Sequence, residues 1–388
     1  MSETKITSKK TEEISGLKPT KIFQWLGIIV LVYCLITAVS LIGSGFKLTA
    51  GDQAKALFTF ATNPFAGLIV GILATALIQS SSTVTSIIVG LVAGGLPVMM
   101  AVPMIMGSNI GTTITNTLVS LGHINDKDEF EKAFSAATVH DFFNLLCVLI
   151  FLPLEITLHP LEKTAFWVSN FFLGGNSTNI DRFNFIQIAT APLVNLFNRL
   201  SQIFPNPFDG IGLIVIGIIL IFSSIFYLGK LLKLLMVGEA KVLLRQAIGR
   251  APLIGIFSGT IVTILVQSSS TTTSLIIPLA GTGLLTLEEV YPFTLGANIG
   301  TCITALIAAT AVTENHLAAL QIAMVHLLYN IFGVTIIYGI PFLRNLPLLG
   351  AKTLATIASK RNYLAFIYIL TVFFLVPSLF LGITSINP

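Results

Sequence analysis

The chain carries "QSSSTVTS" at residues 79–86 and "QSSSTTTS" at residues 267–274, two octapeptides that differ at one position. Each interrupts a segment, 63–95 or 251–283, that is otherwise apolar enough to lie in a bilayer. Backbone without regular helical hydrogen bonds is tolerated at membrane depth only where protein or a water-filled cavity surrounds it. Each segment therefore predicts a re-entrant helical hairpin, in which two half-helices meet at the polar block.

The composition is typical of a protein embedded in lipid. Of the 388 residues, 54% are hydrophobic and 10% are charged, and the mean hydropathy is +0.91, which excludes a water-soluble globular protein. A run of about 20 apolar residues can cross a bilayer as a helix. Besides the two hairpins, such runs predict an all-α polytopic membrane protein with about seven full transmembrane spans, at 22–45, 97–120, 133–153, 210–237, 286–311, 317–341 and 363–384.

The basic residues favour a cytoplasmic N-terminus. If each hairpin returns to the side it entered from, 16 of the 21 lysines and arginines lie inside and five lie outside. The chain then begins with a flexible cytoplasmic tail (1–21), followed by the first spans with the first repeat (22–154). Next come an external loop region (155–208), with one amphipathic or partly embedded segment near 183–200, and a linking span with a cytoplasmic segment (209–250). The second repeat (251–341) and a cytoplasmic loop with the last span (342–388) complete the order.

The two hairpins belong to a longer internal repeat. Residues Pro64, Gly71 and Gln79 recur 188 positions later, and "GSNIGTTIT" at 107–115 matches "GANIGTCIT" at 296–304 in seven of nine positions. Three spans lie between the hairpins, so the first would open to the outside and the second to the cytoplasm. An inverted repeat with interrupted helices indicates a secondary transporter with its site near the bilayer midplane.

The polar breaks are suited to binding ions. A broken helix leaves unpaired carbonyls at the end of its first half and unpaired N–H groups at the start of its second half. Serine and threonine hydroxyls cap helices, donate to anions and coordinate cations, and Gln79 and Gln267 add amides. Hydroxyls in membrane helices also bond to their own backbone or to a neighbouring helix. Two near-identical blocks at symmetry-related breaks favour a binding site over that alternative.

The two "G-x-N-I-G-T" blocks combine close packing with oxygen ligands. Their glycines have the four-residue spacing that lets membrane helices approach closely. Packing alone does not require the uncharged amides and hydroxyls beside them, which suit a hard monovalent cation. Both roles are expected together for Asn109, Thr112, Thr113, Asn298 and Thr301.

Charged side chains are absent around both polar blocks. Residues 63–120 contain no Asp, Glu, Lys or Arg, and residues 251–313 contain only Glu288 and Glu289. An unpaired anion at membrane depth is costly. Helix ends, hydroxyls and co-bound cations would have to compensate an anion here, which makes its binding depend on the cation and predicts symport.

Asp141 is the exception within the spans, next to His140 on the helix predicted at 133–153. An intramembrane carboxylate is a functional hypothesis by default. In the repeat, "HDFFN" at 140–144 aligns with "HLLYN" at 326–330, so the partner of Asp141 is Leu327 and an extra cation would bind in one half only. For His140 and His326 a packing role is favoured over a ligand role. A serine hydrolase is disfavoured because adjacent His and Asp on one helix point in different directions, and the chain is not expected to be an enzyme.

Duplicated "QSSS" blocks, each followed by "GSNIGTT" or "GANIGT", with "TVHDFFN" after the first, resemble the type II sodium-dependent phosphate cotransporters. The resemblance covers about 60–155 and 245–340. The external loop has no cysteines and the termini are short, so the chain is similar to a compact bacterial-type member. The resemblance implies an inverted-repeat fold with a moving core, inorganic phosphate as substrate, co-transported sodium and no organic cofactor.

The resemblance also implies ligands. The phosphate ligands would be Gln79, Ser80, Ser81, Ser82, Thr83, Gln267, Ser268, Ser269, Ser270 and Thr271. The sodium ligands expected from the resemblance and from oxygen chemistry are Ser80, Ser82, Asn109, Thr112, Thr113, Asp141, Asn144, Ser268, Ser270, Asn298, Thr301 and Asn330. In that family, an aspartate at the place of Asp141 accompanies electrogenic transport.

We therefore expect an electrogenic sodium/phosphate symporter of the plasma membrane that works by alternating access. Composition and spacing alone indicate only a cation-coupled, inverted-repeat transporter. A sodium-coupled carrier of another small anion such as a dicarboxylate, a phosphate exporter and a passive anion channel are the alternatives. The expected partners are phosphate, sodium, the lipid bilayer and, as one option, a second copy in a homodimer, but no nucleic acid.

Overall fold

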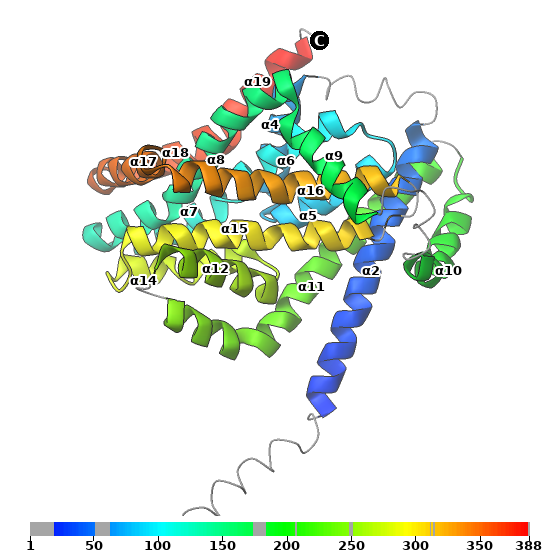
Figure 1. Cartoon of the computed structure of the whole chain (residues 1–388), viewed down its shortest axis with the longest axis horizontal. Helices are drawn as coiled ribbons and strands as arrows, with labels where there is room; N and C mark the ends of the chain where they lie inside the picture. The colour runs from blue at the N-terminus through cyan, green and yellow to red at the C-terminus, as the bar shows by residue number, and fades with distance from the viewer. Residues whose placement is uncertain are drawn as a thin grey trace, which may run out of the picture.

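A computed structural model describes residues 19–50, 63–173, 184–205, 208–247, 251–310, 312 and 315–386, which are helical with short connections and contain no strand (Figure 1). Seven stretches among them are long and apolar enough to cross a membrane: Phe23–Thr49, Val98–His123, Lys127–Leu158, Phe208–Leu232, Leu287–Thr310, His316–Tyr338 and Tyr363–Ile383. Each coincides with one of the seven expected spans. The prediction of an all-α polytopic membrane protein is confirmed.

Several spans are built from more than one helical piece. The elements are α2 (Pro19–Ala50), α6 (Val98–Gly111) with α7 (Ile114–Ser120) and η4 (Leu121–His123), α8 (Lys127–Leu158), α11 (Phe208–Ala247), α15 (Leu287–Thr310), α16 (His316–Gly333) with η6 (Val334–Tyr338), and α18 (Tyr363–Leu370) with η7 (Thr371–Leu375) and α19 (Val376–Ile386). The pieces η6 and η7 are π-helical turns, which are common as single-turn insertions within longer helices.

Both polar blocks interrupt helices where the sequence predicts. In the first segment, α4 (Pro64–Ile78) ends and α5 (Ser81–Ala93) begins on either side of Gln79 and Ser80. In the second, α12 (Pro252–Val266) is followed by α13 (Ser269–Ser274) and α14 (Ile277–Gly281), and the chain bends by 119° at the break. The second half of this segment is divided further because Pro278, at the start of α14, has no N–H to continue the helix.

Three regions differ from the expected layout. Of the predicted tail 1–21, residues 1–18 lie outside the described residues, and residues 19–21 form the first turn of α2. The predicted external loop contains α10 (Asn184–Ser201), near the expected amphipathic segment, and also α9 (Pro160–Phe172), which the sequence analysis did not predict. The predicted cytoplasmic loop at 342–362 is largely the helix α17 (Pro341–Lys360). Both unpredicted helices begin at a proline, which is well suited to the first helical turn.

The two "G-x-N-I-G-T" helices pack against the first halves of the two interrupted segments in the same way. A Cβ on Gly71 would collide with the Met104 carbonyl, and a Cβ on Gly107 would collide with the Leu68 carbonyl. The α12–α15 pair repeats this contact at corresponding glycines: a Cβ on Gly259 or Gly296 would strike the carbonyl of Phe293 or Ile256. Only glycine permits so close an approach of two backbones.

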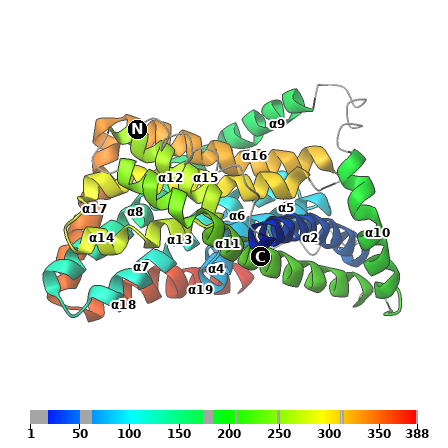
Figure 2. The same cartoon turned by 90° about the horizontal axis from the view of Figure 1, so that it is seen from below.

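The second halves of the two interrupted segments pack on the opposite repeat. The helix α5 contacts α15 and α16, whereas α13 contacts α7, and α14 contacts both α7 and α8. The long helices α2 and α11 pack against each other, and each also contacts an interrupted segment, α5 and α12 respectively. Figure 2 shows α5, α11, α12 and α13 gathered around the middle of the molecule. The fold therefore brings segments nearly 190 residues apart in the sequence to one place.

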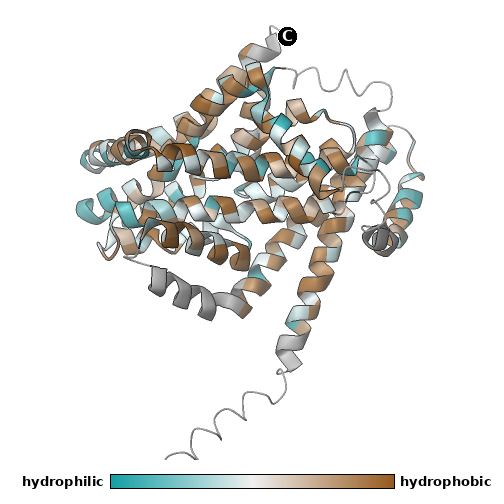
Figure 3. Cartoon of the chain, in the orientation of Figure 1, coloured by the Kyte–Doolittle hydropathy of each residue, from teal (hydrophilic) through white to brown (hydrophobic). Residues whose placement is uncertain are grey.

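Apolar side chains occupy both the interior and the outer surface. The largest fully buried side chains include Tyr291, Tyr329 and Phe143. Large apolar side chains are also exposed on the outward faces, such as Phe23 at 72% and Leu149 at 71%, and the outer helices α2 and α19 are mainly hydrophobic (Figure 3). This distribution is expected where lipid rather than water covers the protein.

Candidate transport site

Both polar blocks line one cavity of about 380 Å³ between α5, α11, α12 and α13. All ten residues predicted as phosphate ligands contribute to its wall: Gln79, Ser80, Ser81, Ser82, Thr83, Gln267, Ser268, Ser269, Ser270 and Thr271. Liquid water occupies roughly 30 Å³ per molecule, so the cavity has room for a small oxyanion together with ions or water.

Each block has the same local geometry. Gln79 and Gln267 adopt left-handed backbone conformations with φ of 56° and 55°, and their N–H groups bond to the carbonyls of Thr75 and Thr263. Positive φ is uncommon for glutamine and marks a residue whose conformation is imposed by its surroundings. The repeated value shows that the two helices end in the same type of turn.

A serine then starts the next helix in each block. The Ser80 side chain accepts a hydrogen bond from the backbone N–H of Thr83 at 3.3 Å, and Ser268 accepts one from Thr271 at 3.2 Å. Both serines have extended backbone conformations, as N-cap residues do. The first serine of each "QSSS" block is therefore fixed as a helix cap that also faces the cavity.

Further hydrogen bonds connect the blocks to other helices. The Thr112 hydroxyl donates to Ser81 Oγ at 2.7 Å, and the Thr304 hydroxyl donates to Gln267 Oε1 at 3.0 Å. Thr112 comes directly after the first "G-x-N-I-G" motif, and Thr304 lies four residues after the end of the second. The helices after each break thus help to orient the residues at the break.

The third wall of the cavity comes from one face of α11. It consists of Phe222, Ile225, Phe226, Gly229 and Lys230, spaced as successive turns of a helix. The expectation that an anion in this region would meet no fixed cation therefore needs correction, because Lys230 lines the cavity. Its position at the end of an apolar run, 37 residues before the second polar block, gave no local signal of this contact.

Four predicted sodium ligands, all asparagines, lie elsewhere. Together with His326 they form a buried group that we call the amide cluster: Asn109, Asn144, Asn298, Asn330 and His326. Asn109 donates to Asn330 Oδ1 at 3.0 Å, and Asn298 donates to Asn144 Oδ1 at 3.2 Å. These two bonds are equivalent under the repeat, since Asn109 corresponds to Asn298 and Asn144 to Asn330. Each joins one half of the chain to the other.

The remaining bonds close the amide cluster. Asn298 also donates to Asn330 Oδ1 at 2.6 Å, Asn144 donates to the Asn109 carbonyl at 2.7 Å, and His326 Nε2 lies 3.1 Å from Asn109 Oδ1. The side-chain oxygens of Asn109, Asn144 and Asn330 therefore already accept hydrogen bonds. Their sodium role stays a prediction, and the network shows a second role in holding the two halves together.

Asp141 forms a separate polar centre, and its carboxylate is buried on α8. The Tyr368 hydroxyl donates to Asp141 Oδ2 at 2.8 Å, and the Thr117 hydroxyl lies 3.5 Å from the same oxygen. Thr113 is nearby, but its hydroxyl donates to the Ile110 carbonyl, which leaves Asp141 Oδ1 without a donor. One carboxylate oxygen is thus available to a cation. Tyr368, from the last span, was not predicted as part of any site.

The predicted sodium ligands are consequently divided among several places. Ser80, Ser82, Ser268 and Ser270 line the cavity. Thr301 donates to the Ala297 carbonyl of its own helix at 3.1 Å, much as Thr113 does to Ile110, so both hydroxyls form the ordinary backbone contacts of membrane helices. The structure brings together the members from the two "QSSS" blocks but does not unite the whole set.

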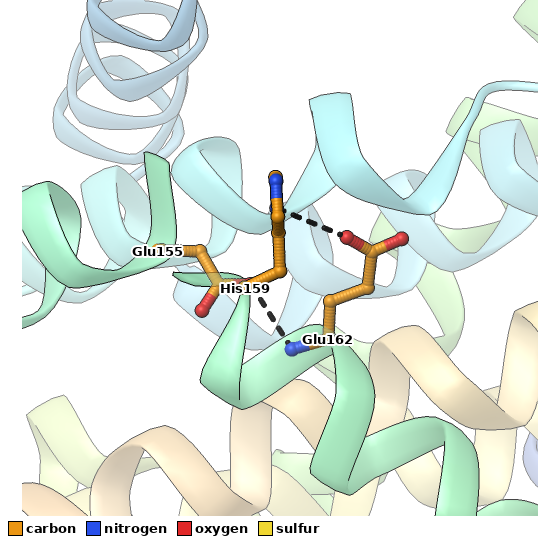
Figure 4. A group of neighbouring side chains, drawn as sticks. All are labelled: Glu155, His159 and Glu162. Atoms are coloured by element: carbon orange, nitrogen blue, oxygen red, sulfur yellow. Dashed lines mark hydrogen bonds and ion pairs between the residues drawn. The ribbon is translucent and has the colours of Figure 1, made fainter. Parts of the chain in front are cut away.

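Another group of titratable side chains lies at the corner between α8 and α9 (Figure 4). The Glu155 carboxylate accepts the backbone N–H groups of Leu161 and Glu162 at 2.9 and 3.0 Å, and His159 Nδ1 lies 3.4 Å from Glu162 Oε2. Glu155 thereby satisfies the first N–H groups of α9. These contacts account for the group as the connection between two helices.

Comparison with known proteins places this chain in a family. The family described as Na+/Pi-cotransporter matches residues 34–230 and again 220–343. The chain is 32% identical to the sodium-dependent phosphate transport protein 2B of Homo sapiens, over 93% of this chain and 66% of that protein. It is 35% identical to the sodium-dependent phosphate transport protein 2A of Rattus norvegicus, over 97% of this chain and 69% of that protein.

The chain thus spans about two thirds of the length of the 2B proteins that it matches. One of them is the 2B protein of Pongo abelii, to which the chain is 32% identical over 66% of that protein. No solved structure matches it. The family match extends over most of the sequence and includes both polar blocks and both "G-x-N-I-G-T" blocks. This protein belongs to the Na+/Pi-cotransporter family.

Proposed function

We propose that this protein is a sodium-coupled symporter of inorganic phosphate. The observation that carries the proposal is the single cavity onto which both "QSSS" blocks converge. A cavity lined by hydroxyls and amides from two helix breaks offers donors to an anion and oxygens to a cation in the same space. The sodium-dependent phosphate transport named for the 2A and 2B proteins supports this choice of anion and cation.

In this proposal, phosphate binds among the ten residues of the two "QSSS" blocks that line the cavity. The start of α5 contributes backbone N–H groups and the positive end of a helix dipole. Oxygens of Ser80, Ser82, Ser268 and Ser270 bind sodium beside the anion. Because each ion lowers the electrostatic cost of the other, phosphate and sodium bind cooperatively and travel together.

Asp141 provides a further sodium site in this proposal. Its Oδ1 has no hydrogen-bond donor, while Tyr368 fixes the other oxygen of the carboxylate. An additional sodium ion bound there would carry charge that phosphate does not neutralise, and transport would be electrogenic. Leu327 stands at the equivalent place in the second half of the chain, so this site has no repeat-related partner.

The proposed mechanism is alternating access by an inverted repeat in the plasma membrane, with the N-terminus in the cytoplasm. Three observations support the repeat: the equivalent glycine contacts of α4–α6 and α12–α15, the packing of α5 and α13–α14 on the opposite halves, and the paired asparagine bonds of the amide cluster. The two interrupted segments act as re-entrant hairpins that expose the cavity to each side in turn.

The test is uptake of labelled phosphate by proteoliposomes that contain the purified protein, with and without an inward sodium gradient. We expect saturable uptake that requires the gradient and is inhibited by arsenate. Replacement of sodium by choline serves as the cation control, and empty liposomes give the background. Sodium-independent, non-saturating flux would indicate a channel, and competition by a dicarboxylate instead of arsenate would indicate another substrate. Either outcome contradicts the proposal.

A further inference from the structure

The cavity has one asymmetric feature that the two "QSSS" blocks do not explain. Among its described lining residues, Lys230 is the one side chain with a formal charge. The lysine comes from α11, which belongs to neither block. A phosphate ion in the cavity therefore meets hydroxyls and amides from two directions and a cation from a third.

The packing of α11 holds this lysine beside the second break. Gly229 faces α12, where a Cβ on the glycine would lie 3.7 Å from the Val266 carbonyl, one residue before Gln267. Phe222, Ile225 and Phe226 occupy the preceding turns of the same face and form an apolar wall. Lys230 follows at the end of this wall, where the side chain is exposed and a long stem can keep the ammonium group hydrated.

The ammonium group is available to an anion. The three ion pairs found among the described residues involve other groups, His123–Glu129, His159–Glu162 and Lys352–Glu288. The cavity itself contributes no described carboxylate that would neutralise the lysine. A lysine in this setting attracts an anion into the cavity.

We propose that Lys230 is the fixed counter-charge for the transported anion and sets its affinity without binding sodium. This inference rests on the proposed function, since it identifies the residue that recognises the anion in the same cavity. Sodium compensates the anion from the two breaks, and Lys230 compensates it from the wall of α11. The alternative for an exposed lysine near the end of a membrane span is contact with lipid head groups.

The test compares Lys230→Gln, Lys230→Arg and, as a matched control, Lys163→Gln, which removes an exposed lysine on α9 that does not line the cavity. For Lys230→Gln we expect the KM for phosphate to rise about tenfold, which corresponds to about 1.4 kcal/mol. The half-saturating sodium concentration at saturating phosphate should remain within about twofold of wild type. Lys230→Arg should keep the KM within about threefold because the charge is preserved, and the control should behave as wild type.

A binding measurement separates failure of this inference from failure of the proposed function. Phosphate with sodium should raise the Tm of the detergent-purified wild type, and Lys230→Gln should need about tenfold more phosphate for the same rise. That result supports the role of Lys230 even if reconstituted wild-type protein shows no sodium-driven uptake. The inference is overturned if Lys230→Gln transports and binds phosphate with wild-type affinity, or if Lys230→Arg is impaired as strongly as Lys230→Gln.

Discussion

The cavity and the amide cluster both contain polar residues contributed by each of the two repeats, yet these side chains are engaged differently. In the cavity, Ser80 and Ser268 cap helices and still face open space. In the cluster, asparagines donate to one another across the two halves and are almost completely buried. Polar residues at membrane depth can therefore bind a substrate or connect helices, and the hydrogen bonds already made distinguish these roles.

The strongest test of this comparison is the pair Ser80→Ala and Ser268→Ala. We expect each to reduce sodium-dependent phosphate uptake severely and the double variant to abolish it, because both a cavity hydroxyl and an N-cap are lost. Loss of the cap itself should cost only about 1 kcal/mol of stability, so membrane insertion should be normal. Uptake by proteoliposomes and surface quantification of the protein provide the two measurements.

Ser86→Ala is the matched control for these variants. Ser86 belongs to the same octapeptide and the same helix, but it is buried, does not line the cavity, and its hydroxyl has no hydrogen-bond partner in the described structure. Uptake should therefore stay close to wild type. If Ser80→Ala and Ser268→Ala keep wild-type affinities for phosphate and sodium, the octapeptides serve helix packing and do not form the binding site.

The second test is Asn298→Asp in the amide cluster. The substitution preserves the shape of the side chain and removes the N–H groups that donate to Asn144 and Asn330. If the cluster is a closed connection, the buried charge should lower the free energy of unfolding by about 3 kcal/mol or more, and sodium should not restore it. The measurement is the Tm of the purified protein in sodium and in choline.

A sodium site at the same place would respond in the opposite way. A carboxylate in place of the amide would attract the cation, and sodium should then raise the Tm of Asn298→Asp more than that of wild type. Asn170→Asp is a suitable control, because the Asn170 side chain on α9 donates only to the Phe166 carbonyl in an exposed position. Its Tm should differ little from wild type in either salt.

The third and smallest effect on uptake is expected at Asp141. For Asp141→Gly, net inward current per transported phosphate should fall while uptake persists, because one sodium-binding carboxylate is lost. Simultaneous current and tracer measurements give this ratio. Since glycine costs about 1 kcal/mol within a helix, Asp141→Asn serves as a second variant with the same expected change in charge.

Tyr368→Phe tests the hydrogen bond to the Asp141 carboxylate independently of the carboxylate itself. It removes the 2.8 Å hydrogen bond to Asp141 and leaves the charge in place. The current per phosphate should equal that of wild type, with a change of only a few fold in sodium affinity. An unchanged current ratio in both Asp141 variants would show that Asp141 is not a sodium ligand and that its bond to Tyr368 serves to connect α8 with α18.

Several parts of the fold could be predicted because they depend on neighbouring residues in the sequence. Apolar runs indicate the seven spans, and the polar blocks indicate where α4 and α12 end. The helices α9 and α17 were missed because they are short or only partly apolar and lie in segments assigned to loops. The division between α13 and α14 follows from Pro278, which is a local signal in the sequence.

The candidate site was predictable to the extent that it repeats. Duplication drew attention to the two "QSSS" blocks, and the family resemblance implied the ten ligands in them that line the cavity together with other residues. Lys230 and Tyr368 were not identified, because each lies at the edge of an ordinary apolar span and reaches its polar neighbours only through packing. No pattern within their own segments distinguishes them from lysines and tyrosines at a membrane surface.

The sequence by itself determined the helical spans, the two breaks and the serines that cap the following half-helices, since hydropathy and capping act over a few residues. Only the tertiary structure decided that the breaks share one cavity, that Lys230 forms part of its wall, and that the asparagines bond across the halves. Those arrangements depend on contacts between segments far apart in the chain. The packing of α5 on α15 and of α11 on α12 is of this kind, and local composition does not encode it.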